Sequence, residues 1–303
     1  TVCMLVLLWL GVIPAMQAQT FDKLWKEVEQ AEKKSLPQTV IKLTGEIYQK
    51  GEMEKNSPQM LKAYMWRMKY RDMLTPDSLY TGLQELKQWA KQADKPMDRA
   101  ILHSLIAGMY ADYAANNQWQ LRQRTEIAGE APSADMREWT ANMFVEKVRT
   151  NVKEAMADSV LLLNTSSRTY IPFVELGETS EYYHHDMYHL LASRSIEALQ
   201  RIQGLDRTTP IEAYSEETSS EKESLVKQDI ERIYDQMLTS YKAKGDKEGC
   251  LLTSLNYLNW KHGTSKSFRE PFRVKKGGTY MTFDPYETGL DALKTEYKSL
   301  DLC

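Results

Sequence analysis

Three of the five histidines of this chain stand close together, in the run HHDMYH over residues 184–189. His185 and His189 are four residues apart, so on a helix they share one face, the spacing with which many zinc proteases place two ligands. That motif needs a glutamate after the first histidine as general base, whereas Asp186, one methylene shorter, occupies the position. No cluster for a third ligand follows. We therefore interpret the run as a helix N-terminus packed on the preceding loop, and a metal-dependent hydrolase remains a distant alternative.

Other residues that could take part in catalysis or ligand binding are isolated or lie on charged faces. His103 stands alone in an apolar segment, where a histidine is far more often a surface or core residue than a ligand. Arg67, Lys69 and Arg71 form a small basic cluster beside aromatic residues, which we interpret as a solvated ridge. The sequence lacks a Gly-rich phosphate loop, a G-x-S-x-G elbow and a C-x-x-C pair. We expect no catalytic, cofactor-binding or metal-binding residue, no cofactor and no enzymatic activity.

The composition indicates an α-rich protein. The chain has 303 residues, 42% of them hydrophobic and 27% charged, with 14 glycines and 10 prolines. Low Gly plus Pro content and few β-branched runs favour helices, and the length suffices for one large or two small cores. The formal net charge of −3 gives no electrostatic footprint for nucleic acid.

Prolines punctuate the first third of the chain at points where new helices can begin. Each occupies a first-turn position, with Ser57 or Thr75 as a plausible N-cap. Between the prolines, apolar residues recur at three- and four-residue spacing, and a helix pair recurs about every 40 residues, as in hairpin repeats. We predict an all-α solenoid of antiparallel α-hairpins, similar to tetratricopeptide or HEAT repeats but without their strict signature. The prolines are Pro37, Pro58, Pro76 and Pro96.

The remainder predicts longer helices and one short β-hairpin. Apolar spacing predicts a helix from Ser133 to about Leu163, and another ends near Gln203. Gly245 is the expected C-cap of a helix that begins near Glu221. A β-hairpin near 268–283 is indicated because FRV and TYMTF flank Lys-Lys-Gly-Gly. The further helices expected are Tyr183–Gln203, Lys247–Trp260 and Tyr286–Leu300.

The N-terminus resembles a secretory signal peptide. Residues 2–13 are almost entirely apolar, and Pro14 ends this run, which is too short for a membrane span. A candidate cleavage site for signal peptidase follows. We expect a signal peptide over 1–18, truncated upstream, a helical-repeat domain over 19–203, and a second helical block over 204–303, truncated at its end. The mature protein would be periplasmic or secreted, with no membrane span. Cys250 and Cys303 would remain, and their pairing is left open.

Several segments resemble the N-terminal helical region of large bacterial alpha-2-macroglobulin-like proteins. The resemblance runs from about residue 21 to the end, and the stretch 159–199 is its most distinctive part. No thioester motif follows Cys250 or Cys303, so no functional residue of the family transfers to this chain. The segments are FDKLWKEVEQAEKKSLPQTVIKLTGEIYQK, LTPDSLYTGLQELKQW, AILHSLIAGMYADY, DSVLLLNTSSRTYIPFVELGE, HDMYHLLASRSIEAL and YETGLDALKTEYKSLDLC.

The resemblance implies a structural or interaction region of a secreted endopeptidase inhibitor that traps proteases. Proteases would then be partners of missing downstream domains, while the solenoid face would offer a docking surface for protein. The alternative is a free-standing periplasmic helical-repeat adaptor that binds a peptide or protein partner. A continuation of the reading frame past Cys303 into β-rich sequence would distinguish the two.

Overall fold

The computed structural model describes residues 20–75, 78–124, 133–175, 177, 186–206, 224–265, 268, 271–276 and 279–300. The expected signal peptide, His184, His185 and Cys303 lie outside the described residues. The chain forms two compact units, Thr1–Leu79 and Tyr80–Cys303, which we describe separately. The domain boundary expected between residues 203 and 204 falls inside the second unit and stays a prediction of the sequence.

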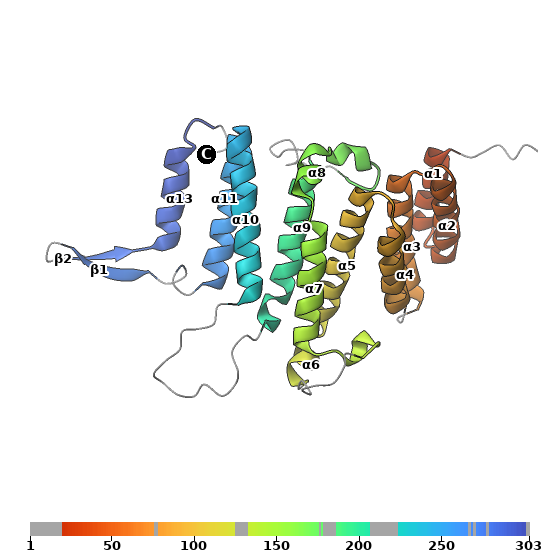
Figure 1. Cartoon of the computed structure of the whole chain (residues 1–303), viewed down its shortest axis with the longest axis horizontal. Helices are drawn as coiled ribbons and strands as arrows, with labels where there is room; N and C mark the ends of the chain where they lie inside the picture. Colours follow the sequence, from red (N-terminus) through yellow and green to blue (C-terminus); the bar gives the residue numbers. More distant parts are fainter. Residues whose placement is uncertain are drawn as a thin grey trace, which may run out of the picture. The chain divides into compact units, whose positions relative to one another are not determined.

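The first unit consists of three helices in its described part, α1 (Phe21–Lys33), α2 (Pro37–Met53) and α3 (Ser57–Leu74). Turns of three residues join them, so neighbouring helices run antiparallel (Figure 1). Ser35 and Lys55 occupy equivalent places in the two turns with φ of 53° and 52°. The shared core contains Leu24, Val28, Ala31, Val40, Ile47 and Ala63.

The helix starts confirm part of the proline-based prediction. Pro37 is the first residue of α2 and Pro96 the first of α5 (Pro96–Asn116), where the missing N–H of proline has no partner to lose. The predicted cap at Ser57 was wrong, because Asn56 accepts from Gln59 N at the start of α3. Asn56 is the cap because its side-chain carbonyl, one residue before Ser57, reaches the unpaired backbone N–H of Gln59 in the first turn of α3. Thr75 is the C-cap of α3, and its predicted role as an N-cap involves residues 76–77, which lie outside the described residues.

In the second unit, α5, α7 and α9 pack on one another, and a row of helices starts at α9 (Figure 1). The helix α5 packs on α7 and α9, and from α9 the row continues through α10 and α11 to α13. The all-α fold predicted from the sequence is confirmed. The described elements, besides α5, are α4 (Ser78–Gln92), α6 (Gln118–Gln123), η1 (Met136–Glu138), α7 (Ala141–Ala155), α8 (Ser159–Asn164), η2 (Ser167–Tyr170), α9 (Met187–Ile202), η4 (Gln203–Leu205), α10 (Leu225–Lys244), α11 (Lys247–Thr264), β1 (Phe272–Lys276), β2 (Thr279–Phe283) and α13 (Pro285–Glu296).

Helix α5 has a buried residue on every side. Twelve of its 21 residues are buried, among them Ile101, Leu105 and Tyr110. Near its N-terminus, the buried carboxylate of Asp98 accepts a hydrogen bond of 2.6 Å from the hydroxyl of Tyr170 in η2. Burial and this carboxylate raise the pKa of Tyr170 well above its ordinary value, so the phenol stays a donor. The bond fixes η2 to the start of the central helix.

Two local predictions are confirmed. Gly245 ends α10 in the left-handed conformation, with φ of 70°, where a side chain would be strained. The strands β1 and β2 form an antiparallel hairpin in which Phe272 pairs with Phe283 and Lys276 with Thr279. The lysines expected in the turn therefore belong to β1.

The single long helix expected from Ser133 to Leu163 was wrong. The segment is divided into η1, α7 and α8. Thr140 caps α7 by accepting from Met143 N, and Asp158 caps α8 by accepting from Leu161 N at 2.9 Å. Each cap gives the backbone an alternative to helix continuation that apolar spacing does not reveal.

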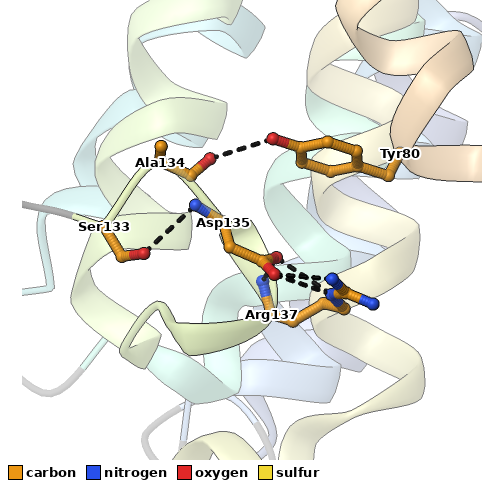
Figure 2. A network of polar contacts seen from close by, with 5 residues as sticks. All are labelled: Tyr80, Ser133, Ala134, Asp135 and Arg137. Carbon is orange, nitrogen blue, oxygen red and sulfur yellow. Dashed lines mark hydrogen bonds and ion pairs between the residues drawn. The ribbon is translucent and has the colours of Figure 1, made fainter.

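A polar network fastens α4 to the segment before α7 (Figure 2). The hydroxyl of Tyr80 donates to the carbonyl oxygen of Ala134 over 3.2 Å, and Ser133 Oγ accepts from Asp135 N over 3.1 Å. The guanidinium of Arg137 donates to both carboxylate oxygens of Asp135, at 2.7 to 3.0 Å. These bonds lower the pKa of Asp135 below its usual range. Ser133 thus organises a turn instead of starting a long helix.

Two glycines of α2 provide a matched test of helix packing. A Cβ at Gly51 would lie 2.8 Å from Met60 Cγ and 3.3 Å from Met60 N, whereas a Cβ at Gly45 would meet nothing within 4 Å. Alanine gains about 1 kcal/mol of helix propensity at either position, so Gly45→Ala should raise the free energy of unfolding. Gly51→Ala should leave the protein about 1–3 kcal/mol less stable than Gly45→Ala, because the added carbon overpacks the α2–α3 contact. Urea denaturation followed by far-UV circular dichroism measures both, and equal stability of the two variants would refute the close packing.

Candidate functional site

Asp186 of the histidine run caps a helix. It precedes Met187, the first residue of α9, and its Oδ1 accepts from His189 N at 2.8 Å. Its Oδ2 lies 2.7 Å from Lys244 Nζ at the end of α10, and the carboxylate side chain is only 10% exposed. Both oxygens are therefore engaged, which leaves this carboxylate badly placed to act as a general base.

The start of α9 packs on the loop before it, as the sequence predicts. Met187 N donates to the carbonyl of Thr165 over 2.8 Å, and Ser166 forms an isolated antiparallel bridge with Asp186. The ring of His189 bonds through Nδ1 to the hydroxyl of Tyr241 on α10. The described part of the run thus joins α8, α9 and α10, while His185 lies outside the described residues. Among the described residues, no group of three His, Cys, Asp or Glu side chains could hold a metal ion.

The basic cluster of α3 lies over aromatic rings. The guanidinium of Arg67 is 5.1 Å from the ring centroid of Tyr48 and 5.3 Å from that of Tyr64. The ammonium of Lys69 is 5.4 Å from the Tyr70 ring. Such contacts hold a cation against a ring face, so two of the three predicted ridge residues also pack on aromatic neighbours. Arg71 lies in the last turn of α3.

Cys250 is a free, buried thiol in α11. Burial raises its pKa, although a hydrogen bond with Tyr297 opposes the shift. A thiol with a raised pKa carries little thiolate, so it is a poor nucleophile. The other predicted partner, Cys303, lies outside the described residues.

A groove of about 760 Å³ is bordered by α9, α10 and α11. From α10 it is lined by Tyr234 and Met237, which are buried. The flanking helices line it with both exposed polar residues, such as Gln200 and Asn256, and buried residues, such as Trp260. The buried residues of α10 therefore form the floor of the groove, and α9 and α11 form its walls. Figure 1 shows the three helices side by side, with α10 in the middle.

Four side-chain amides define the polar character of this groove. They stand in pairs three residues apart, Gln200 and Gln203 on one wall and Asn256 and Asn259 on the other. Residues with this spacing share one helix face, so each wall presents two amides in the same direction.

The protein itself fixes two of these amides. Gln203 Oε1 accepts from the indole N–H of Trp260 at 3.1 Å, and Asn259 Oδ1 accepts from the hydroxyl of Tyr286 at 2.7 Å. Since their oxygens are used, the NH2 groups of Gln203 and Asn259 are the parts that can meet a ligand. The walls therefore offer oriented hydrogen-bond donors.

Aromatic stacking joins the α10 floor to the α11 wall. The rings of Tyr234 and Tyr257 are stacked with centroids 4.7 Å apart, and Trp260 stacks on Tyr257 at 6.0 Å. Thr253, which is 1% exposed, also lines the groove, and within the described part of the chain its Oγ1 has no hydrogen-bond partner. An unpaired buried hydroxyl costs about 1–3 kcal/mol, and a ligand that supplied a partner would recover that free energy.

Sequence reasoning missed the groove. It treated the chain after Gln203 as a second block, so the amides of α9 and α11 were never considered together. The available signal was the spacing itself, two amides at i and i+3 on each of two predicted helices. No local pattern could show that α10 would bring the two faces to opposite sides of one groove.

Comparison with known proteins yields no relative. No family model matches the chain, and no curated protein or solved structure matches it significantly. Within the described ranges, no helix combines the length and the apolar character needed to cross a membrane.

The structural role of Asp186 can be tested by comparing two replacements. Asp186→Ala removes the cap and the partner of Lys244 and should lower the free energy of unfolding by about 1–3 kcal/mol. Asp186→Asn keeps a capping oxygen and should lose less, close to the loss in Lys244→Gln. Urea denaturation of the three variants measures this order. A stable Asp186→Ala variant would show that α9 does not need its cap.

Proposed function

We propose that the protein binds an extended polypeptide segment of a partner in the groove over α10 and catalyses no reaction itself. The observation that carries this proposal is the pair of fixed amides, whose oxygens are held by Trp260 and Tyr286 and whose NH2 groups remain for a ligand. Peptide carbonyls are the acceptors that such donors match, because every residue of an extended chain supplies one.

The other features of the groove fit a peptide better than a small charged ligand. Among the lining residues, Glu197 is the one acidic side chain and the imidazole of His189 the one basic group. A nearly neutral groove has little to attract an ionic substrate, whereas amides and hydroxyls serve a neutral backbone. The aromatic rings of Tyr234 on the floor and Trp260 on the α11 wall can hold an apolar side chain of the bound segment.

The sequence resemblance gives this binding role a setting. We propose that the region is part of a secreted or periplasmic alpha-2-macroglobulin-like endopeptidase inhibitor. In that protein it would be a non-catalytic docking arm, and other domains would trap the protease. This setting is supported by the amino-acid sequences of the segments 21–50, 158–178 and 185–199, which resemble that family. A free-standing helical-repeat adaptor would use the same groove, so the binding proposal is shared by both.

Conservative acid replacements test the amide donors directly. Gln203→Glu and Asn259→Asp keep the acceptor oxygens for Trp260 and Tyr286 but remove the NH2 donors. Peptides selected from a random display library on the unmodified protein should bind the double variant about tenfold or more weakly, because two hydrogen bonds are lost. Isothermal titration calorimetry with one selected synthetic peptide measures the change.

A steric variant provides the control. Gly263 lines the groove, and a Cβ there would meet nothing within 4 Å, so Gly263→Trp should fill the groove without strain. Gly45→Trp places the same side chain on α2, in the other unit, where a Cβ is equally free. Loss of peptide binding in the first variant alone is expected. A library that yields no binder, or a peptide that binds Gly263→Trp as tightly as the unmodified protein, would refute the groove.

The assignment of inhibition to other domains has its own test. A trap must be cut and then close around the protease, so this chain alone should not slow digestion of a large protein substrate. The measurement is the rate of substrate loss with and without an excess of the chain, using several proteases. Strong inhibition by the chain alone would contradict the docking role and require an inhibitory surface within it.

A further inference from the structure

A second, smaller cavity of about 380 Å³ lies between α4, α5 and α7, away from the groove. Its floor is apolar and buried, with Ala90, Ile106 and Tyr110. Its polar lining is strongly cationic, and no Asp or Glu is among the described residues that line it. The basic groups are Lys87 and Lys91 of α4, Arg99 and His103 of α5, and Lys147 of α7.

Three lysines and one arginine thus share one cavity without a counter-charge among the described residues that line it. Within the described part of the chain, Lys87, Lys91, Arg99 and Lys147 take part in no ion pair. Like charges held together around a cavity repel one another, and the walls of low dielectric strengthen that repulsion. A chain with a formal net charge of −3 has enough carboxylates to avoid this arrangement, yet none lies here.

The clustered charges affect the pKa of Lys87. This lysine is half-buried, and its pKa is lowered first by desolvation and then by the charges of Lys91 and Lys147. Both effects disfavour the charged ammonium. A bound anion would reverse the electrostatic part of this shift, so ligand binding and the charge on Lys87 are coupled.

The histidine at the edge of the cavity has a defined orientation. Asn151 Nδ2 donates to the carbonyl of Lys147 over 2.8 Å, which turns Asn151 Oδ1 toward His103. That oxygen lies 2.8 Å from His103 Nδ1, so the ring donates through Nδ1. Nε2 is then the nitrogen that remains for a ligand, and it can accept a hydrogen bond from a P–OH group.

We propose that this cavity binds a phosphate group, free or as part of a small phosphorylated molecule, through Lys87, Arg99 and Lys147. A phosphate dianion neutralises more of the clustered charge than a single carboxylate does. Arginine offers a forked pair of donors to its oxygens, and lysine acts as a point charge. The volume is near the lower end of small-molecule sites, which fits phosphate with a short organic part.

The proposal is tested by titrating the protein with inorganic phosphate and with glycerol 3-phosphate, against sodium chloride at the same ionic strength. Phosphate should bind saturably in calorimetry and raise the unfolding midpoint, whereas chloride should not. Tighter binding of the ester would identify a phosphorylated molecule as the ligand, and equal or tighter binding of inorganic phosphate would identify the free anion. Heat and stability changes that chloride reproduces would overturn the proposal.

Charge removal gives the matched variants. Lys87→Met and Lys147→Met keep the length of the side chain and should each weaken phosphate binding at least tenfold. Because they relieve repulsion, the unfolding midpoint without phosphate should stay the same or rise, which excludes simple misfolding. Lys153→Met alters an exposed lysine of the same helix α7 outside the cavity and should bind as the unmodified protein does. Unchanged binding in Lys87→Met, or an equal loss in Lys153→Met, would refute the site.

Discussion

The burial of α5 is the constraint on which the second unit depends. A helix with apolar residues on every side cannot lie at the surface, so it must be covered on several faces at once. The helices α7 and α9 supply two of these covers, and fully burying each large aliphatic side chain contributes about 1.5–3 kcal/mol. Tyr110, packed beside Trp139 and Phe144, extends the contact toward α7. Both proposed sites lie on helices that this packing positions.

Polar anchors then set the helices that hydrophobic packing leaves adjustable. Asp186 joins the start of α9 to the end of α10 through its cap and Lys244. Near the start of α10, the carboxylate of Asp229 lies 2.5 Å from Arg149 Nε on α7 and is only 11% exposed. Buried charges of this kind add little net stability, but they penalise any shift that would separate the partners. The groove over α10 depends on that fixed spacing.

The two sites differ in their electrostatics, and this difference is why we propose different ligands for them. The groove has a nearly neutral, amide-rich lining on rigid aromatic rings, which suits a polypeptide backbone. The cavity beside α5 concentrates positive charge around an apolar floor, which suits a compact anion. Since different helices form the two sites, occupation of one does not block the other.

Local physics in the sequence determined most of the helices. Apolar spacing, Pro37 and Pro96 at helix starts, and Gly245 at a helix end act within a few residues, so they could be identified without the fold. The same reasoning failed between Ser133 and Leu163, because the caps Thr140 and Asp158 compete with an apolar pattern that continues through them. It also could not find the sites. Lys87 and Lys147, or Gln203 and Asn259, are separated by more than 50 residues, and only the packing of α5 and α10 against their neighbours brings each pair to one cavity or groove.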